Sequence, residues 1–102
     1  MMNYRKARQL AETWVALVSD DAAVIVDVLP RPYGWVFFWE SRRFLETSQT
    51  PDRLAGNAPI LIDRVDGELR VTGTAYPIEH YLQMYEATLP AARLQMIPEL
   101  PQ

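Results

Sequence analysis

The sequence predicts a single α+β domain with a four-stranded antiparallel sheet and an N-terminal and a C-terminal helix packed on one face. Apolar residues recur at helical spacing near both ends of the chain, and four short stretches between them have the composition of strands. A chain of 102 residues can close about one hydrophobic core. Short turns between successive strands favour antiparallel pairing, and both helical stripes then need a common sheet face to cover.

The first helix is predicted to follow Asn3, whose side chain can cap a helix N-terminus. Ser19, Asp20 and Asp21 form turns readily and end the helical pattern. Between these limits the apolar residues repeat every three or four positions, which places them on one side of a helix: Tyr4, Ala7, Leu10, Ala11, Trp14, Leu17 and Val18.

Four strands are predicted from β-branched and alternating residues. The Asp66-Gly67 pair suits a tight hairpin turn with a positive backbone φ angle between the last two. The proline-rich "PRPYG" separates the first two strands, because proline continues a strand poorly. The four stretches are "AVIVDVL" (23–29), "WVFFWE" (35–40), "PILID" (59–63) and "ELRVT" (68–72).

The last helix is predicted to open at Pro77, a favoured first helical residue, and to end at Pro90. We expect one domain over residues 1–90 and a tail over 91–102 that adds at most one helical turn. Residues 41–58 show no clear pattern beyond a turn at Thr50-Pro51 and a helical turn at Arg53–Ala55. The apolar stripe of the last helix consists of Ile78, Tyr81, Leu82, Tyr85 and Leu89.

Alternation along "WVFFWE" divides its side chains between the two faces of the sheet. Trp35, Phe37 and Trp39 share one face, and we expect them to form the core together with Trp14, Tyr81 and Tyr85. If both helices cover that face, the opposite face exposes apolar side chains next to charged ones. We therefore predict a partner-binding surface there, with a polar rim, made of Val36, Phe38, Leu61, Glu40, Arg42, Arg43 and Glu46. The alternative is that residues 41–58 fold back over this face and hide it.

Composition excludes several classes of function. A net charge of −3 provides no basic field for a nucleic-acid backbone, so nucleic acid is not expected as a partner. The longest apolar runs have five residues, far below the roughly 20 of a membrane span. The absence of cysteine and of an N-terminal secretory pattern is typical of a cytoplasmic protein.

The residues that could support catalysis are few. His80, the one histidine, could act as a general base for Ser41 or Ser48, but a histidine flanking an apolar helical stripe is the better interpretation. Glu40 and Glu46 could form an acid–base pair, although nothing near them predicts a substrate cleft.

The carboxylates of Asp63, Asp66 and Glu68 could bind a hard cation, but their spacing is not that of a calcium loop. Hairpin turns commonly contain such residues. We therefore predict no catalytic residue, no metal and no cofactor.

Four segments in order, "GWVFFWESRRFLET", "LAGNAPILID", "DGEL" and "GTAYPIEHYL", resemble the YrhB family of small bacterial α+β proteins, also called immunity protein 35. The resemblance runs from about Tyr4 to Glu86. Its most specific residues are Trp35, the turn Gly56-Asn57-Ala58-Pro59, and Gly73-Thr74. We interpret the glycines as turn residues and Thr74 as a helix cap.

The resemblance implies a non-catalytic immunity protein that binds and neutralises a cognate toxin of a polymorphic toxin system. The alternative function is a stand-alone stress-related or chaperone-like protein that binds apolar segments through the mixed sheet face. A homodimer formed through that face is a further candidate assembly. A toxin gene directly upstream would favour the first function, and an isolated gene would favour the second.

Overall fold

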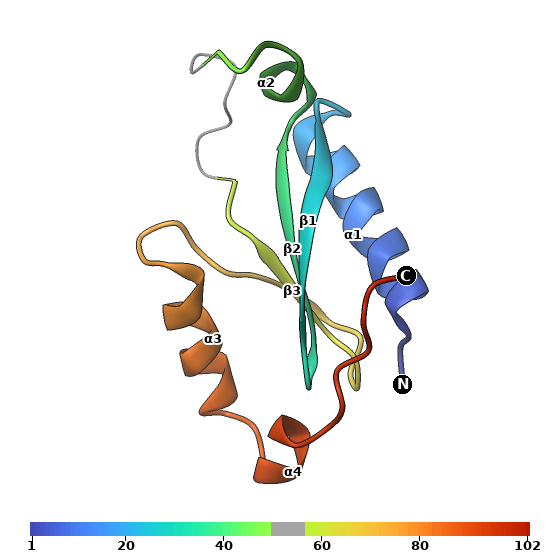
Figure 1. Cartoon of the computed structure of the whole chain (residues 1–102), viewed down its shortest axis with the longest axis vertical. Helices are drawn as coiled ribbons and strands as arrows, with labels where there is room; N and C mark the ends of the chain where they lie inside the picture. The colour runs from blue at the N-terminus through green and yellow to red at the C-terminus, as the bar shows by residue number, and fades with distance from the viewer. Residues whose placement is uncertain (50–56) are drawn as a thin grey trace.

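A computed structural model describes residues 1–49 and 57–102. The strands form one antiparallel sheet in the order β1-β2-β3-β4, which confirms the predicted α+β class. Figure 1 shows this sheet with α1 and α3 beside it. In chain order the elements are α1 (Tyr4–Ser19), β1 (Ala23–Arg31), β2 (Gly34–Ser41), α2 (Arg42–Thr47), β3 (Ile60–Asp63), β4 (Leu69–Val71), α3 (Ile78–Glu86) and α4 (Ala91–Leu94).

Helix α1 covers one face of the sheet. It begins as predicted, because the Asn3 side chain accepts a hydrogen bond from the backbone N–H of Lys6 at 2.9 Å. It ends at Asp20, which takes a left-handed conformation. A single core is buried between the helix and the sheet, made of Tyr4, Ala7, Ala11 and Val15 from α1 with Ala23, Trp35, Phe37, Ile60 and Ile62.

Helix α3 covers the opposite face, so the prediction that both helices pack on one face is wrong. A second core contains Leu82 of α3 together with Tyr33, Val36 and Leu61. Figure 1 shows α1 and α3 on opposite sides of the sheet. The physical reason lies in β2 and β3, which carry buried apolar side chains on both faces and therefore need a cover on each.

The predicted core residues are accordingly divided between two layers. Trp35 and Phe37 are fully buried under α1, as expected. Trp14 and Trp39 are partly buried beside them, with their rings 5.8 Å apart in an edge-to-face arrangement. Tyr85, by contrast, packs against the second core and lies 5.5 Å from the ring of Tyr33.

The two hairpins differ in how far they follow the sequence pattern. "PRPYG" does not keep its strands apart, because β1 continues to Arg31 and β2 begins at Gly34. Gly34 is required there, since a Cβ atom would lie 2.1 Å from the carbonyl oxygen of Ile62. In the second hairpin Gly67 has the predicted positive φ angle, 70°.

Residues 41–49 contain a helix that the sequence pattern did not reveal. The Ser41 hydroxyl accepts a hydrogen bond from the N–H of Phe44 at 2.8 Å and caps α2. The expected turn at Thr50-Pro51, the helical turn at Arg53–Ala55 and Gly56 lie outside the described residues.

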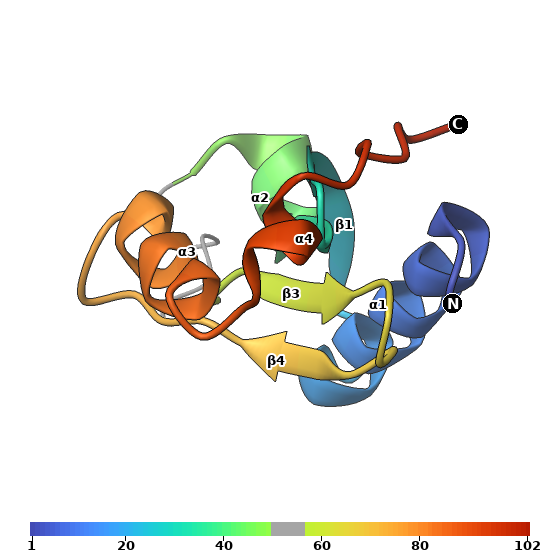
Figure 2. The same ribbon diagram turned by 90° about the horizontal axis from the view of Figure 1, so that it is seen from below.

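The tail crosses from the α3 side of the sheet to the α1 side, as Figures 1 and 2 both show. Its predicted helical turn is α4. The Arg64 guanidinium donates a hydrogen bond to the carbonyl of Ile97 at 2.7 Å, and the Trp35 indole donates to the carbonyl of Glu99 at 2.7 Å. These bonds attach the tail to the end of the sheet.

Candidate interaction surfaces

The apolar residues predicted to bind a partner lie beneath α3. Val36 and Leu61 are buried, and Phe38 is partly buried against the same second core. The prediction that this face is uncovered is therefore wrong. The alternative, in which residues 41–58 fold over this face, rests largely on residues 50–56, which lie outside the described residues. Among the described residues, Val36 and Leu61 share a cluster with Leu82 of α3.

The predicted polar rim is divided between the interior and the surface. Glu40 is buried, and its carboxylate accepts a hydrogen bond from the backbone N–H of Ser41 at 2.8 Å. Arg42, Arg43 and Glu46 are exposed on α2. The Arg42 guanidinium donates to the carbonyl of Asp21 at 3.0 Å, so α2 is attached to the end of α1. A partner contact through these three side chains remains a prediction.

The edges of the sheet offer little to an added strand. The outer strand β1 has an irregular register between Ile25 and Asp27. The Asp27 carboxylate accepts a hydrogen bond from the N–H of Val28 at 2.8 Å, and Pro30 has no N–H to donate. The opposite edge, β4, has only three residues. Bulges, charges, proline and short length are the usual protections of edge strands, so a partner is expected on the helical surfaces.

The carboxylates considered for a cation are occupied by the protein itself. Asp63 is fully buried, and its carboxylate accepts hydrogen bonds from the Tyr85 hydroxyl and the Arg93 guanidinium. Asp66 and Glu68 form ion pairs with Arg70 at 2.8 and 2.9 Å. Among residues 1–49 and 57–102, no three acidic or histidine side chains gather in a way that could hold a metal ion.

The electrostatics of Asp63 follow from these bonds. Burial acts to raise the pKa of this carboxyl, but the hydrogen bonds from Tyr85, Arg93 and the backbone of Val65 outweigh it and lower the pKa. Burial, and then the bond to Asp63, raises the pKa of the Tyr85 hydroxyl. Asp63 is therefore a charged structural group that connects β3, α3 and α4.

The candidate catalytic groups are likewise in structural positions. The Ser41 hydroxyl caps α2, and Ser48 ends the same helix in a left-handed conformation. His80 is exposed on α3, and its ring lies 4.3 Å from that of Tyr76 and 5.4 Å from that of Tyr81. This arrangement is a surface cluster of aromatic rings and contains no serine.

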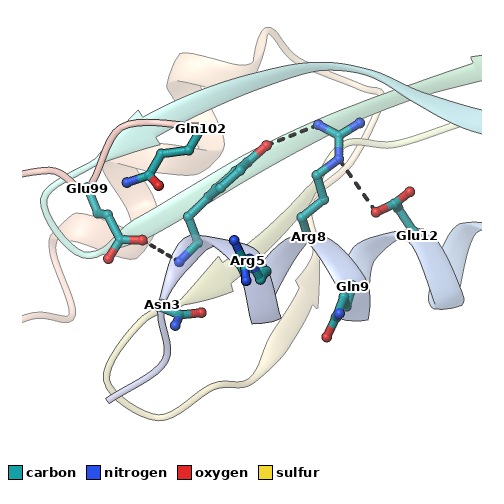
Figure 3. Close-up of a pocket in the computed structure, with 8 residues that line it drawn as sticks. Asn3, Arg5, Arg8, Gln9, Glu12, Glu99 and Gln102 are labelled. Carbon is teal, nitrogen blue, oxygen red and sulfur yellow. Dashed lines mark hydrogen bonds and ion pairs between the residues drawn. The ribbon is translucent and has the colours of Figure 1, made fainter.

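A polar groove of about 680 Å³ runs beside the first half of α1. Figure 3 shows Glu99 and Gln102 of the tail at one end and Arg8 with Glu12 toward the other. Arg8 donates to the Tyr4 hydroxyl at 3.0 Å and lies 3.5 Å from the Glu12 carboxylate. The Glu99 carboxylate accepts from the backbone N–H of Tyr4 at the positive end of the helix dipole. The tail thus supplies the anion that this helix end favours.

The outward side of α3 carries a cluster of large exposed side chains. Tyr76 and Met84 are 59% and 60% exposed, and His80 lies between them in sequence at a spacing of four residues. Residues four apart are neighbours on a helix, so His80 and Met84 share one stripe, which the ring of Tyr76 extends through its stacking on His80. We call these three side chains the outer stripe of α3. The sequence contains all three residues, but only the structure shows that the ring of Tyr76 lies against His80.

The loop before α3 explains two of the family motif residues. Gly73 leaves room for Tyr81, because a Cβ atom on Gly73 would lie 2.5 Å from the tyrosine oxygen. Close packing and not a left-handed backbone is therefore the reason for glycine here. Thr74 is exposed, and α3 has Pro77 at its N-cap without a side-chain bond, so the predicted cap at Thr74 is wrong.

The fold is that of a small α+β protein in which Ser41 caps a helix and Asp63 and Asp66 form internal hydrogen bonds or ion pairs. The family described as Immunity protein 35 matches residues 5–86, and the chain belongs to this family. A relative named "Uncharacterized protein YrhB" from Escherichia coli (strain K12) is 57% identical over 87 residues, which cover 84% of this chain and 90% of the relative. No solved structure matches the chain. No helix among the described residues has the length and apolar character needed to span a bilayer.

Proposed function

We propose that this protein neutralises a cognate toxin of a polymorphic toxin system by binding it in the bacterial cytoplasm. Its membership of the immunity protein 35 family, over residues 5–86, carries the proposal. Binding without catalysis is supported by the structural use of the serines and carboxylates that could otherwise act on a substrate.

The sequence interpretation that favoured the chaperone-like alternative does not hold in the structure. That function relied on an open mixed face of the sheet, but Val36 and Leu61 are buried under α3. The YrhB relative is described as uncharacterised and adds no evidence for either function.

Co-expression tests the proposal directly. The toxin domain encoded beside the gene of this protein is expressed in a bacterial host with and without the protein, and growth is measured. We expect the protein to restore growth and to co-purify with the toxin domain as a stable complex. The proposal is wrong if no toxin gene adjoins its gene, or if growth stays arrested although the protein is folded.

A substitution at His80 separates binding from catalysis. Phenylalanine keeps a flat ring that can lie against Tyr76 but removes both titratable nitrogens. Because His80 lies on an exposed surface that can contact the toxin, we measure binding and protection together and expect the protection given by His80→Phe to follow its affinity for the toxin. Loss of protection in a folded His80→Phe protein that still binds the toxin would indicate catalysis instead.

A further inference from the structure

The outer stripe of α3 adds large exposed side chains to an otherwise polar helical surface. A helix that buries one stripe usually exposes charged and polar residues on the other side. Helix α3 does expose Glu79, His80 and Gln83, but Met84 on the same helix and Tyr76 in the loop before it are also more than half exposed. Tyrosine and methionine are enriched at protein interfaces. The composition of this stripe is therefore that of a contact surface.

The stripe is also held in a defined conformation. The Tyr81 hydroxyl accepts hydrogen bonds from the backbone N–H groups of Ala75 and Tyr76, at 3.1 and 3.2 Å. The ring of Tyr76 stacks on His80 at 4.3 Å. Because the loop before the helix is bonded to the helix, Tyr76 loses little conformational freedom when a partner covers it. Such pre-organisation favours affinity.

The charge around the stripe indicates the kind of partner. Residues 71–92 contain Glu79 and Glu86 and no lysine or arginine. Glu79 is exposed in the first turn of α3, next to His80. In contrast, α2 carries Arg42 and Arg43 beside Glu46, and the groove beside α1 is lined by Arg5 and Arg8 as well as Glu12 and Glu99. Of these surfaces, the stripe is the one with acidic and no basic neighbours in its segment, so it complements a positively charged partner.

We propose that the outer stripe of α3, with Glu79 at its rim, is the docking surface for the toxin, and that the matching toxin patch has an apolar centre bordered by lysine or arginine. This inference rests on the proposed function, because the partner is the toxin. Tyr76 and Met84 are the central anchors, and Glu79 accelerates association through its charge.

Binding measurements with the toxin domain encoded beside the gene test this surface. We expect Tyr76→Ala and Met84→Ala each to weaken the affinity at least about tenfold, as for interface anchors. Glu79→Lys should slow association, and the difference from wild type should shrink as salt is added. Unchanged thermal unfolding midpoints will show that the variants remain folded.

Matched controls lie on other helices. Leu45 of α2 is 53% exposed, so Leu45→Ala removes an apolar side chain comparable to Met84 from a different helix. Glu12→Lys reverses an exposed charge on α1 as Glu79→Lys does on α3. We expect both control variants to bind the toxin domain like the wild-type protein.

The outcomes separate this inference from the proposed function. If wild type binds and protects while the α3 variants bind as tightly and Glu46→Lys or Arg5→Glu fails, the toxin uses another surface and the inference is wrong. If Tyr76→Ala instead disrupts a dimer seen by sedimentation, the stripe binds a second copy and the inference is also wrong. If wild type neither binds nor protects, the proposed function fails and the inference fails with it.

Discussion

The two long helices of this protein cover opposite faces of the same sheet in different ways. Helix α1 buries Tyr4, Ala7, Ala11 and Val15, each at 4% exposure or less. Helix α3 buries only Leu82 to a similar degree. The outward sides differ along their length. Helix α1 exposes polar residues such as Arg5 and Gln9 in its first half, and Leu17 and Val18, which were predicted on its apolar stripe, are exposed in its last turn. Helix α3 exposes Met84 beside His80 and Glu79.

The difference in burial indicates that the two helices contribute unequally to stability and to recognition. The two buried alanines of α1, Ala7 and Ala11, let the helix approach the sheet closely, so the large rings of Trp35 and Phe37 are fully enclosed. Helix α3 is held more by polar contacts, such as the bond from the Tyr33 hydroxyl to the Glu86 carboxylate at 2.7 Å. We infer that the α1 layer supplies most of the folding free energy and that the α3 layer presents the contact surface.

The largest predicted effect is in the α1 layer. Phe37→Ala removes a fully buried ring between Tyr4 and the sheet, and should lower the free energy of unfolding by about 3–5 kcal/mol. Urea denaturation measures this directly. A change below about 1 kcal/mol would contradict the assignment of the main core to this layer.

A smaller effect is expected on the other side of the sheet. Leu82→Ala removes the one fully buried side chain of α3 and should cost about 2–3 kcal/mol. The same denaturation experiment compares the two layers. If Leu82→Ala costs more than Phe37→Ala, the α3 layer dominates stability and the comparison drawn above is reversed.

The Asp63 carboxylate should contribute about 2 kcal/mol through its bonds to Tyr85 and Arg93. Because its pKa is lowered in the folded protein, this contribution is complete above the ordinary pKa of about 3.9. It is lost as the pH falls through the lower pKa of the folded state.

Asp63→Asn should therefore be less stable than wild type at pH 7, and the difference should shrink as the pH falls below about 4. The pKa of Asp66 is also lowered, chiefly by its hydrogen bond with Arg70, but Asp66 is present in both proteins and cancels in the difference. A difference that stays constant with pH would show that Asp63 is not held as a charged group.

The smallest predicted effect on stability concerns the loop before α3. Tyr81→Phe removes the hydroxyl that accepts from Ala75 and Tyr76, and should cost about 0.5–1 kcal/mol. Its effect on toxin affinity should be relatively larger, because Tyr76 is no longer held in place. Calorimetric binding and thermal unfolding of the same variant test this, and an unchanged affinity would contradict the pre-organisation of Tyr76.

Elements that depend on local geometry were predictable from the sequence. Asn3 begins α1, Gly67 turns the second hairpin, and the apolar stripe that contains Leu82 faces the sheet. Capping, positive φ angles and helical periodicity involve residues within one or two turns of each other, so their energetics are present in a short segment.

The candidate site was less predictable for a physical reason. Alternation along β2 correctly separated Trp35 from Val36, but it could not say which face each helix would cover. Helix α2 was missed because its one clear signal, Ser41 as a cap, lies in a short segment of mixed polarity. The role of Tyr33 was hidden because a turn residue is normally exposed, and here it is buried against α3.

The sequence by itself determined the α+β class, the order of the four strands and of α1 and α3, and the family, because these depend on local patterns and on motifs in order. Only the tertiary structure decided that α3 closes the second face of the sheet. That placement buries Val36 and Leu61 and leaves Tyr76 and Met84 in water. The reason is that the path of the chain between distant elements decides which apolar surfaces other elements bury. The apolar surfaces that stay exposed are available to a partner.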